Sequence, residues 1–486
     1  MILINLDEKI RIPKYKQIIQ QIIDKINKGV LKPGDRLPST RNLSESLEIN
    51  RITVSSAYQE LWALGYIDLN AGACAVVRNR NQLMKTTSLE PGVINWSELA
   101  SSESNCTLDY YINSQPCKNN NLIDFSTLNM ENNLLPVESF RTSLNEIIKQ
   151  KGSDLFSYGN SLGYLPLREY LSNHLETHGI SVSPDEILIT NGTQQALDLI
   201  LRMAACKGKS IVVEAPTYKE IIPLIKYYKF NPIEVPMEPY GMNLDVLEEV
   251  INRYKPALIY TMPNFHNPTG ITTNQAHREK LLYIAEKYKI PIIEDGFQEE
   301  MKYFGKTVLP IKSMDKNKAV IYCGTFSKVL FPGIRVGWIA ADRECILRVA
   351  AIRHYSEISL SMILQAGLFE FCSNGYYEKH LNKVHRTFRK RMNIAINSMN
   401  RHLDKNYVSW EEPSGGFLIW IKFKRNPLIN LEEVLKENGI RASLGHNYFI
   451  NGTKNTFLRL SISSLSEDDI EEGIRRFGNV IKQIYK

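Results

Sequence analysis

Residues that could form a covalent bond and residues that could hold a charged group lie together in the stretch GTFSKVLFPGIRVGW. Lys328 follows the hydroxyl residues Thr325 and Ser327, and Arg335 comes seven positions after the lysine, beyond a Pro-Gly turn. A lysine amine can condense with an aldehyde, whereas an arginine beside hydroxyl groups can hold a phosphate. The stretch therefore predicts one site with an amine and a phosphate-binding group.

Two other apolar runs of the chain end in residues that suit the same kind of ligand. After ILIT come Gly192, Thr193 and Gln194, which open a predicted helix whose free N–H groups and dipole favour a phosphate. After SIVVEAP comes Tyr218, whose ring can stack on a flat ligand. Taken singly, these two patterns are better explained by a plain capped helix and by a tyrosine packed in the core.

Two further runs end in an amide and in a carboxylate. ALIYTMP leads to Asn267, which could donate to a ring hydroxyl or simply form a turn before Pro268. IPIIED ends at Asp295, next to Glu294. Burying an isolated carboxylate is costly, so we expect a cationic partner there.

A phosphate cradle, a stacking aromatic ring, an amide, a carboxylate and a lysine are together what pyridoxal 5'-phosphate (PLP) requires. Lys328 would form the Schiff base with its aldehyde. Asp295 would keep the pyridine nitrogen protonated, because a nearby negative charge favours the cationic form. Arg335, Thr325 and Ser327 would neutralise the phosphate.

The elements that must position these residues are short apolar runs alternating with helical stretches. The alternation predicts an α/β unit with a mostly parallel sheet covered by helices. In such sheets ligands collect at the carboxyl ends of the strands, where the residues named above fall. The five predicted strands are 187–190, 210–216, 257–263, 290–295 and 319–325.

The first eighty residues have a different pattern. Isoleucines on one face of 15–28 predict a helix, Ser39 or Thr40 can cap a second helix, and Asn50 can cap a third. The stretch YIDLNAGACAVVR then alternates around a turn at 70–72, as a small hairpin would. Three helices and a hairpin predict a winged helix-turn-helix.

The third of these helices carries the side chains expected to read DNA. Its N-terminal part offers Arg51, Thr53 and Ser55 to a major groove, while Arg36 and Arg41 could meet phosphates. Residues 1–80 hold twelve Lys and Arg against eight Asp and Glu, which fits nucleic acid. A helical cap whose surface happens to carry arginines is the alternative.

Composition excludes several other classes of protein. The net charge is a mild +7, no apolar run reaches the length of a membrane span, and no signal peptide is seen. The seven cysteines are scattered, so we expect neither a disulfide framework nor a metal site. A cytoplasmic location is expected, because disulfides are rare in that reducing compartment. The basic stretch KVHRTFRKR at 383–391 is interpreted as a solvated helix face, with a second DNA-contacting patch as the alternative.

The quoted motifs resemble two known families. The first eighty residues, with PG-R-LPS-R-L and R-TV--AY--L---G, resemble the GntR winged helix. The rest of the chain resembles fold-type I aminotransferases in the motifs TNGTQQALDL, EAPTY, PNFHNPTG, TFSKVLFPGIRVGW and LRLSIS. Together they resemble the MocR/GabR group of regulators. The resemblance implies a DNA-binding domain at 1–78, a linker at 79–121, and a PLP-binding effector domain at 122–486 that ends in a small α+β subdomain.

The resemblance also implies roles for individual residues. Tyr158 matches a position that reaches a phosphate across a dimer interface, and Arg459 matches the arginine that binds a substrate carboxylate. The aminotransferase-like pattern departs at Phe297, where a tyrosine usually donates to the ring hydroxyl, and Glu220 stands where some relatives have an arginine. In the wing, Cys74 and its alanine neighbours offer little to a base.

We therefore expect a homodimeric, PLP-dependent transcriptional regulator that binds double-stranded promoter DNA and has no membrane partner. It would sense an amino compound through formation of an external aldimine. A PLP-dependent aminotransferase with an accessory DNA-binding head is the first alternative, because most residues for transamination are present. A sensor of PLP itself is the second.

Overall fold

The computed structural model describes residues 3–7, 10–69, 74–78, 94–114, 122–205, 208–305, 308–427, 430–452 and 456–485. The chain forms two compact units, Met1–Trp96 and Ser97–Lys486, each of which has its own core. Among the described residues, no helix combines the length and apolar character needed to cross a membrane.

The first unit is the predicted winged helix-turn-helix. Ser39 accepts a hydrogen bond from the main chain of α2 and Asn50 from that of α3, so both predicted N-caps are confirmed. Ile18, Ile22 and Leu61 are fully buried between the helices. The predicted turn at 70–72 lies outside the described residues. The elements are α1 (Lys14–Asn27), α2 (Thr40–Ser46), α3 (Arg51–Ala63) and the antiparallel hairpin of β1 (Ile67–Asp68) and β2 (Val76–Val77).

The connector is more ordered than its composition predicts. We expected 79–121 to be a partly extended linker, but its described part, 94–114, contains α5 (Trp96–Leu99) and α6 (Ser102–Ser114). Glu103 of α6 pairs with Lys229 at 3.0 Å, and the Lys226 amine donates to the Tyr110 hydroxyl at 2.7 Å. Helix α6 therefore belongs to the second unit, where it packs on α10 (Ile221–Tyr227).

The second unit is built on an eight-stranded sheet in the order β4-β11-β10-β9-β8-β5-β6-β7. Strands β10, β9, β8, β5 and β6 run parallel to one another, which confirms the predicted mostly parallel sheet, whereas β11 is antiparallel to both β10 and β4 and β7 is antiparallel to β6. The strands are β4 (Ile187–Thr190), β5 (Ser210–Ala215), β6 (Asn231–Glu238), β7 (Gly241–Met242), β8 (Leu258–Thr261), β9 (Ile292–Asp295), β10 (Val320–Thr325) and β11 (Gly337–Ala340).

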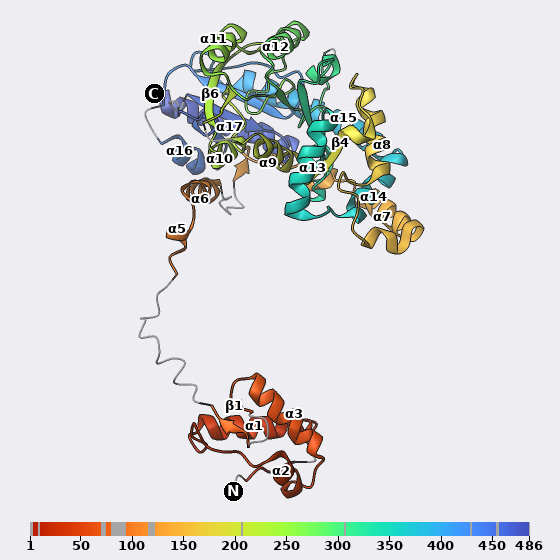
Figure 1. Ribbon diagram of the computed structural model, residues 1–486. Coiled ribbons are helices and arrows are strands. Elements are labelled where there is room, and N and C mark those ends of the chain that lie inside the picture. Colours follow the sequence, from red (N-terminus) through yellow and green to blue (C-terminus); the bar gives the residue numbers. More distant parts are fainter. Residues whose placement is uncertain are drawn as a thin grey trace. The chain divides into compact units, whose positions relative to one another are not determined.

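Helices cover both faces of this sheet (Figure 1). Successive strand residues point to opposite faces, so Val212 packs with α11 (Leu244–Tyr254) and α12 (Gln275–Tyr288), whereas Val213 packs with α9 (Thr193–Ala204) and α13 (Arg343–Glu357). Because both faces are buried, the central strands are apolar runs rather than alternating ones. Their polar residues are confined to the strand ends.

A smaller antiparallel sheet, in the order β12-β13-β16-β15, forms the predicted C-terminal α+β part. Its strands are β12 (Val408–Trp410), β13 (Leu418–Phe423), β15 (Ser443–Leu444) and β16 (Phe457–Ser461). A short parallel pair joins β3 (Ile123–Asp124) to β14 (Ile440–Arg441). The remaining helices are α7 (Val137–Lys151), α8 (Leu165–Glu176), α14 (Met362–Ser373), α15 (Tyr376–His402), α16 (Leu431–Glu437) and α17 (Glu467–Tyr485).

Candidate cofactor and effector site

Asp295 lies at the carboxyl end of β9 and is almost completely buried. The Tyr260 hydroxyl donates to its Oδ2 at 3.0 Å, while its Oδ1 is buried without a hydrogen-bond partner in the described structure. Burial raises the pKa of the Asp295 carboxyl to about 7, although the Tyr260 hydrogen bond and the charge of Lys328 act against this rise. A cation placed against Oδ1 would restore the charged form.

Lys328 lies in the turn that follows β10, on the neighbouring strand. Burial lowers the pKa of its amine to about 8, and the charges of Arg459 and Arg335 lower it further, whereas Asp295 raises it. Lysine is a nucleophile only when it is neutral. The site therefore favours a lysine that can attack an aldehyde near neutral pH.

The N-terminus of α9 and Arg335 lie together at the place where the phosphate cradle was predicted. Gly192 caps the helix with φ of +81°, and a Cβ there would lie 2.7 Å from the Arg335 guanidinium. Arg335 donates to the Asn191 carbonyl at 2.5 Å, and the Thr193 hydroxyl is buried without a partner in the described structure. Glycine is needed here because other residues rarely adopt this positive φ and because a Cβ would collide with the Arg335 guanidinium.

The predicted hydroxyl and amide residues divide into two groups. Thr325 and Ser327 lie together: their hydroxyl oxygens are 3.0 Å apart, and the Ser327 main-chain N–H donates to Thr325 Oγ1 at 3.1 Å. The Gln194 side chain instead forms hydrogen bonds with Glu220 and Tyr218. Its amide donates to the Glu220 carbonyl at 2.9 Å and accepts from the Tyr218 hydroxyl at 3.3 Å.

Asn267 and Arg459 contact each other in the same crevice. The Arg459 guanidinium is buried, donates to Asn267 Oδ1 at 3.1 Å and to the Ser126 carbonyl at 2.5 Å, and lies 5.4 Å from the centre of the Tyr448 ring. The Asn267 amide nitrogen is buried without a partner in the described structure. Tyr218 lies near Asp295 and Arg459, and burial raises the pKa of its hydroxyl.

Two of the singled-out positions add no polar side chain to this cluster. The side chain of Tyr158 is 82% exposed and lies on the surface of the chain, so its role across a dimer interface stays a prediction. Phe297 is buried and brings no hydroxyl. Tyr260 was not among the predicted site residues, but its hydroxyl reaches Asp295 from β8 (Leu258–Thr261). The signal was a tyrosine in an otherwise apolar strand beside the strand that ends in Asp295.

The described residues fit PLP. Asp295 Oδ1, Asn267 Nδ2 and Thr193 Oγ1 are among the buried polar atoms that have no hydrogen-bond partner in the described structure. Buried polar groups are almost always satisfied, so such atoms indicate a polar ligand. A ring nitrogen, a ring hydroxyl and a phosphate are the groups that would pair with them.

A second cluster lies beside Phe297 and was not predicted. His174 and His178 of α8 and its C-terminal turn face Glu300, with His174 Nε2 2.7 Å and His178 Nε2 3.4 Å from Glu300 Oε1. Burial alone would lower the pKa of His174, but the Glu300 carboxylate raises it above its usual range. Burial would raise the pKa of Glu300, but His174 holds it below its usual range. We interpret the cluster as a buried ion pair.

The predicted DNA-reading residues lie on the surface of the first unit. Arg51 is exposed at the first turn of α3, where its Nε is 3.3 Å from the Thr40 hydroxyl. Arg41 pairs with Glu45 at 3.1 Å, so part of its charge is already neutralised. The remaining predicted contacts are the exposed Arg36 and the partly exposed Thr53 and Ser55.

Known proteins share both parts of this architecture. Residues 121–477 match the aminotransferase class I and II family, and residues 14–77 match the gntR family of bacterial regulatory proteins. The HTH-type transcriptional regulator YdfD of Bacillus subtilis is 32% identical over 98% of this chain and 97% of its own length. Aromatic-amino-acid aminotransferase 1 of Thermococcus litoralis is 33% identical over 72% of this chain and 86% of its own.

Solved structures agree with these matches. The multiple substrate aminotransferase from Thermococcus profundus superimposes with a TM-score of 0.75 at 29% identity, over 81% of this chain and 99% of that structure. Aminotransferases of this fold family use PLP. The chain thus belongs to the aminotransferase class I and II family and, with its GntR-type DNA-binding domain, to the MocR type of PLP-dependent transcriptional regulators.

Proposed function

We propose that this regulator binds PLP at Lys328, binds promoter DNA through α3, and responds to an amino compound that enters the crevice. The observation that carries the proposal is that Lys328 lies near Asp295, Arg335 and Arg459 in a chain whose relative YdfD, a transcriptional regulator by name, matches it along 98% of its length. The amino compound remains to be identified.

Each residue has a defined task in this proposal. When bound, PLP supplies an aldehyde that condenses with amines and a ring that withdraws electrons. Lys328 would hold the aldehyde carbon, and its lowered pKa lets the amine leave and return near neutral pH. Asp295 would hold a proton on the ring nitrogen, and Arg335 with the N-terminus of α9 would hold the phosphate.

Arg459 is the proposed partner of an effector carboxylate. Its guanidinium is held by Asn267 and Ser126, so it is oriented before any ligand arrives. A planar guanidinium suits a carboxylate because two parallel hydrogen bonds can form. The effector must bind one arrangement of the dimer better than another, since only differential affinity shifts a population. Tyr158 of a second copy is the proposed additional phosphate contact.

An absorbance titration tests the proposal. The PLP-loaded chain should show a band near the visible edge that disappears in Lys328→Ala and shifts with one amine of a panel. The same amine should change the affinity for a DNA fragment taken from upstream of its own gene. The proposal fails if no amine of the panel affects both the absorbance and the DNA binding.

A second function, transamination, is favoured by one specific observation. The neutralisable Lys328, the Asp295 carboxylate and the buried Arg459 are also what an aminotransferase needs, and aminotransferase relatives match this part of the chain. Sustained production of 2-oxo acids from amino donors, without specific promoter binding, would identify an enzyme. Promoter binding that responds to an amine, without turnover, would identify a sensor.

A further inference from the structure

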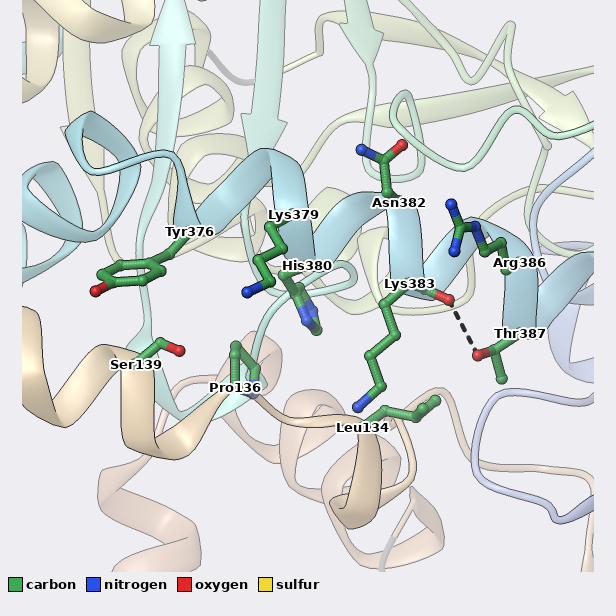
Figure 2. Close-up of a pocket in the computed structure, with 10 residues that line it drawn as sticks. All are labelled: Leu134, Pro136, Ser139, Tyr376, Lys379, His380, Asn382, Lys383, Arg386 and Thr387. Carbon is green, nitrogen blue, oxygen red and sulfur yellow. Dashed lines mark hydrogen bonds between the residues drawn. The ribbon is translucent and has the colours of Figure 1, made fainter.

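The long helix α15 carries a positively charged hollow outside the cofactor crevice. Its volume is about 610 Å³, and no Asp or Glu is among the residues that line it (Figure 2). The cationic residues are Lys379, Lys383 and Arg386, which come from successive turns of the helix. The full lining is Leu134, Pro136, Ser139, Tyr376, Lys379, His380, Asn382, Lys383, Arg386 and Thr387.

These three cations differ from Lys390 and Arg391 of the same helix. Lys390 pairs with Glu467, and Arg391 pairs with Glu131. Lys379, Lys383 and Arg386 are exposed, and none of them forms an ion pair within the described ranges of the chain. Three unpaired like charges on one face repel one another, so the surface gains from a bound polyanion.

The floor of the hollow is fixed in place. His380 lies between Lys379 and Lys383 (Figure 2) and is 5% exposed. It donates its Nε2–H to the Val329 carbonyl at 2.6 Å. Val329 directly follows Lys328, so this hydrogen bond links the base of the hollow to the main chain beside that lysine. The lysines therefore project from a rigid base and not from a loop.

We propose that this hollow is a second DNA-binding surface, at which Lys379, Lys383 and Arg386 contact backbone phosphates. The argument is charge complementarity: the chain already carries a DNA reader, and a duplex is a polyanion with one negative charge per ~1.7 Å of helix axis. Residues four and seven positions apart on a helix lie ~6 Å and ~10 Å apart along its axis, so the cations can meet successive phosphates. The proposal rests on DNA binding by the first unit.

The test is the salt dependence of DNA binding by the PLP-loaded full chain. The probe is a 40-base-pair duplex of arbitrary sequence, titrated between low and physiological salt. The variant is Lys379→Gln, Lys383→Gln, Arg386→Gln. The control, Lys316→Gln, Lys422→Gln, Lys424→Gln, removes the same charge from exposed residues elsewhere.

Each phosphate contact contributes about 0.9 to the slope of log K against log salt. We therefore expect the α15 variant to lower the magnitude of the slope by about 2 to 3 and to weaken binding at least about tenfold at low salt. The control should keep the wild-type slope. Equal slopes for the α15 variant and the control overturn this inference alone, whereas a wild-type chain that binds no duplex overturns the proposed function as well.

A small phosphoanion is the other occupant to be tested. Inorganic pyrophosphate is titrated into the same three proteins by calorimetry, and the duplex titration is repeated in its presence. If pyrophosphate binds the wild-type chain and not the α15 variant, and the DNA slope is the same in both, the hollow is a small-anion site and the DNA proposal is wrong. Competition between pyrophosphate and the duplex at these three residues supports it.

Discussion

Replacing Asp295 by asparagine should stabilise the cofactor-free protein and weaken its binding of PLP. In the cofactor-free protein the carboxyl is buried and has one unsatisfied oxygen, and burial raises its pKa to about 7. A carboxyl whose pKa is raised on folding costs nothing below its unfolded pKa, where it is neutral in both states. The cost grows as the pH rises and is complete above pH 7.

The magnitude follows from the size of the rise. A pKa that moves from 3.8 to about 7 corresponds to about 4 kcal/mol at 1.36 kcal/mol per unit. Asparagine cannot ionise and retains an oxygen for the Tyr260 hydroxyl. Cofactor-free Asp295→Asn should therefore unfold at higher urea than the wild type at pH 8, by up to about 4 kcal/mol, with the difference disappearing near pH 4.

PLP should narrow the difference between the two proteins. The variant loses the charge-assisted hydrogen bond to the ring nitrogen, which contributes about 1.5–3 kcal/mol, so its PLP affinity should fall about ten- to hundredfold. Glu294→Gln is the control: Glu294 is also buried, but its carboxylate accepts from the main chain of Ile311 and Lys312, so PLP binding should be unchanged.

Urea titrations followed by tryptophan fluorescence at pH 4 and pH 8, with and without PLP, measure both effects. The reasoning is refuted if Asp295→Asn leaves the pH 8 stability of the cofactor-free protein unchanged and binds PLP as the wild type does.

Three further perturbations have defined outcomes. Gly192→Ala adds a Cβ 2.7 Å from the Arg335 guanidinium at a positive φ, so PLP affinity measured by absorbance should fall at least about tenfold, and unchanged affinity would contradict the phosphate cradle. His174→Gln removes the ion pair with Glu300, and the stability that the raised histidine pKa contributes is present below about pH 6.5 and lost at higher pH. The variant should therefore be about 1 kcal/mol less stable than the wild type at pH 6 and nearly as stable at pH 9. A difference in stability that does not change with pH would contradict the ion pair. Arg51→Ala should cost about 1–3 kcal/mol in binding to operator DNA in a mobility-shift assay and leave PLP binding unchanged; undiminished DNA affinity would contradict the assignment of α3 as the reading helix.

Much of the crevice could be predicted because parallel strands place their carboxyl ends at one edge of a sheet. Asp295, Asn267 and Lys328 are far apart in sequence, yet each follows an apolar run, so one topological rule brings them together. The caps Ser39 and Asn50 were predictable for a local reason, since a short polar side chain before a helical pattern satisfies free N–H groups.

Other features depend on tertiary neighbours that no local pattern specifies. Strand β11 follows the lysine turn and inserts antiparallel between β10 and β4, a placement set by the sheet as a whole. Tyr260 became part of the site because β8 lies beside β9. Helix α6 has a weak amphipathic pattern. It is held by a hydrogen bond from Lys226 and an ion pair with Lys229, which are more than a hundred residues away in the sequence.

The central claim is that Lys328 is the residue that holds PLP, and borohydride reduction of the PLP-loaded protein tests it most directly. Reduction makes the link permanent, and peptide mass mapping then locates it. The account predicts a phosphopyridoxyl mass on the peptide that contains Lys328 and on no other peptide, together with its loss in Lys328→Ala. A label on another lysine, or no label at all, would contradict it.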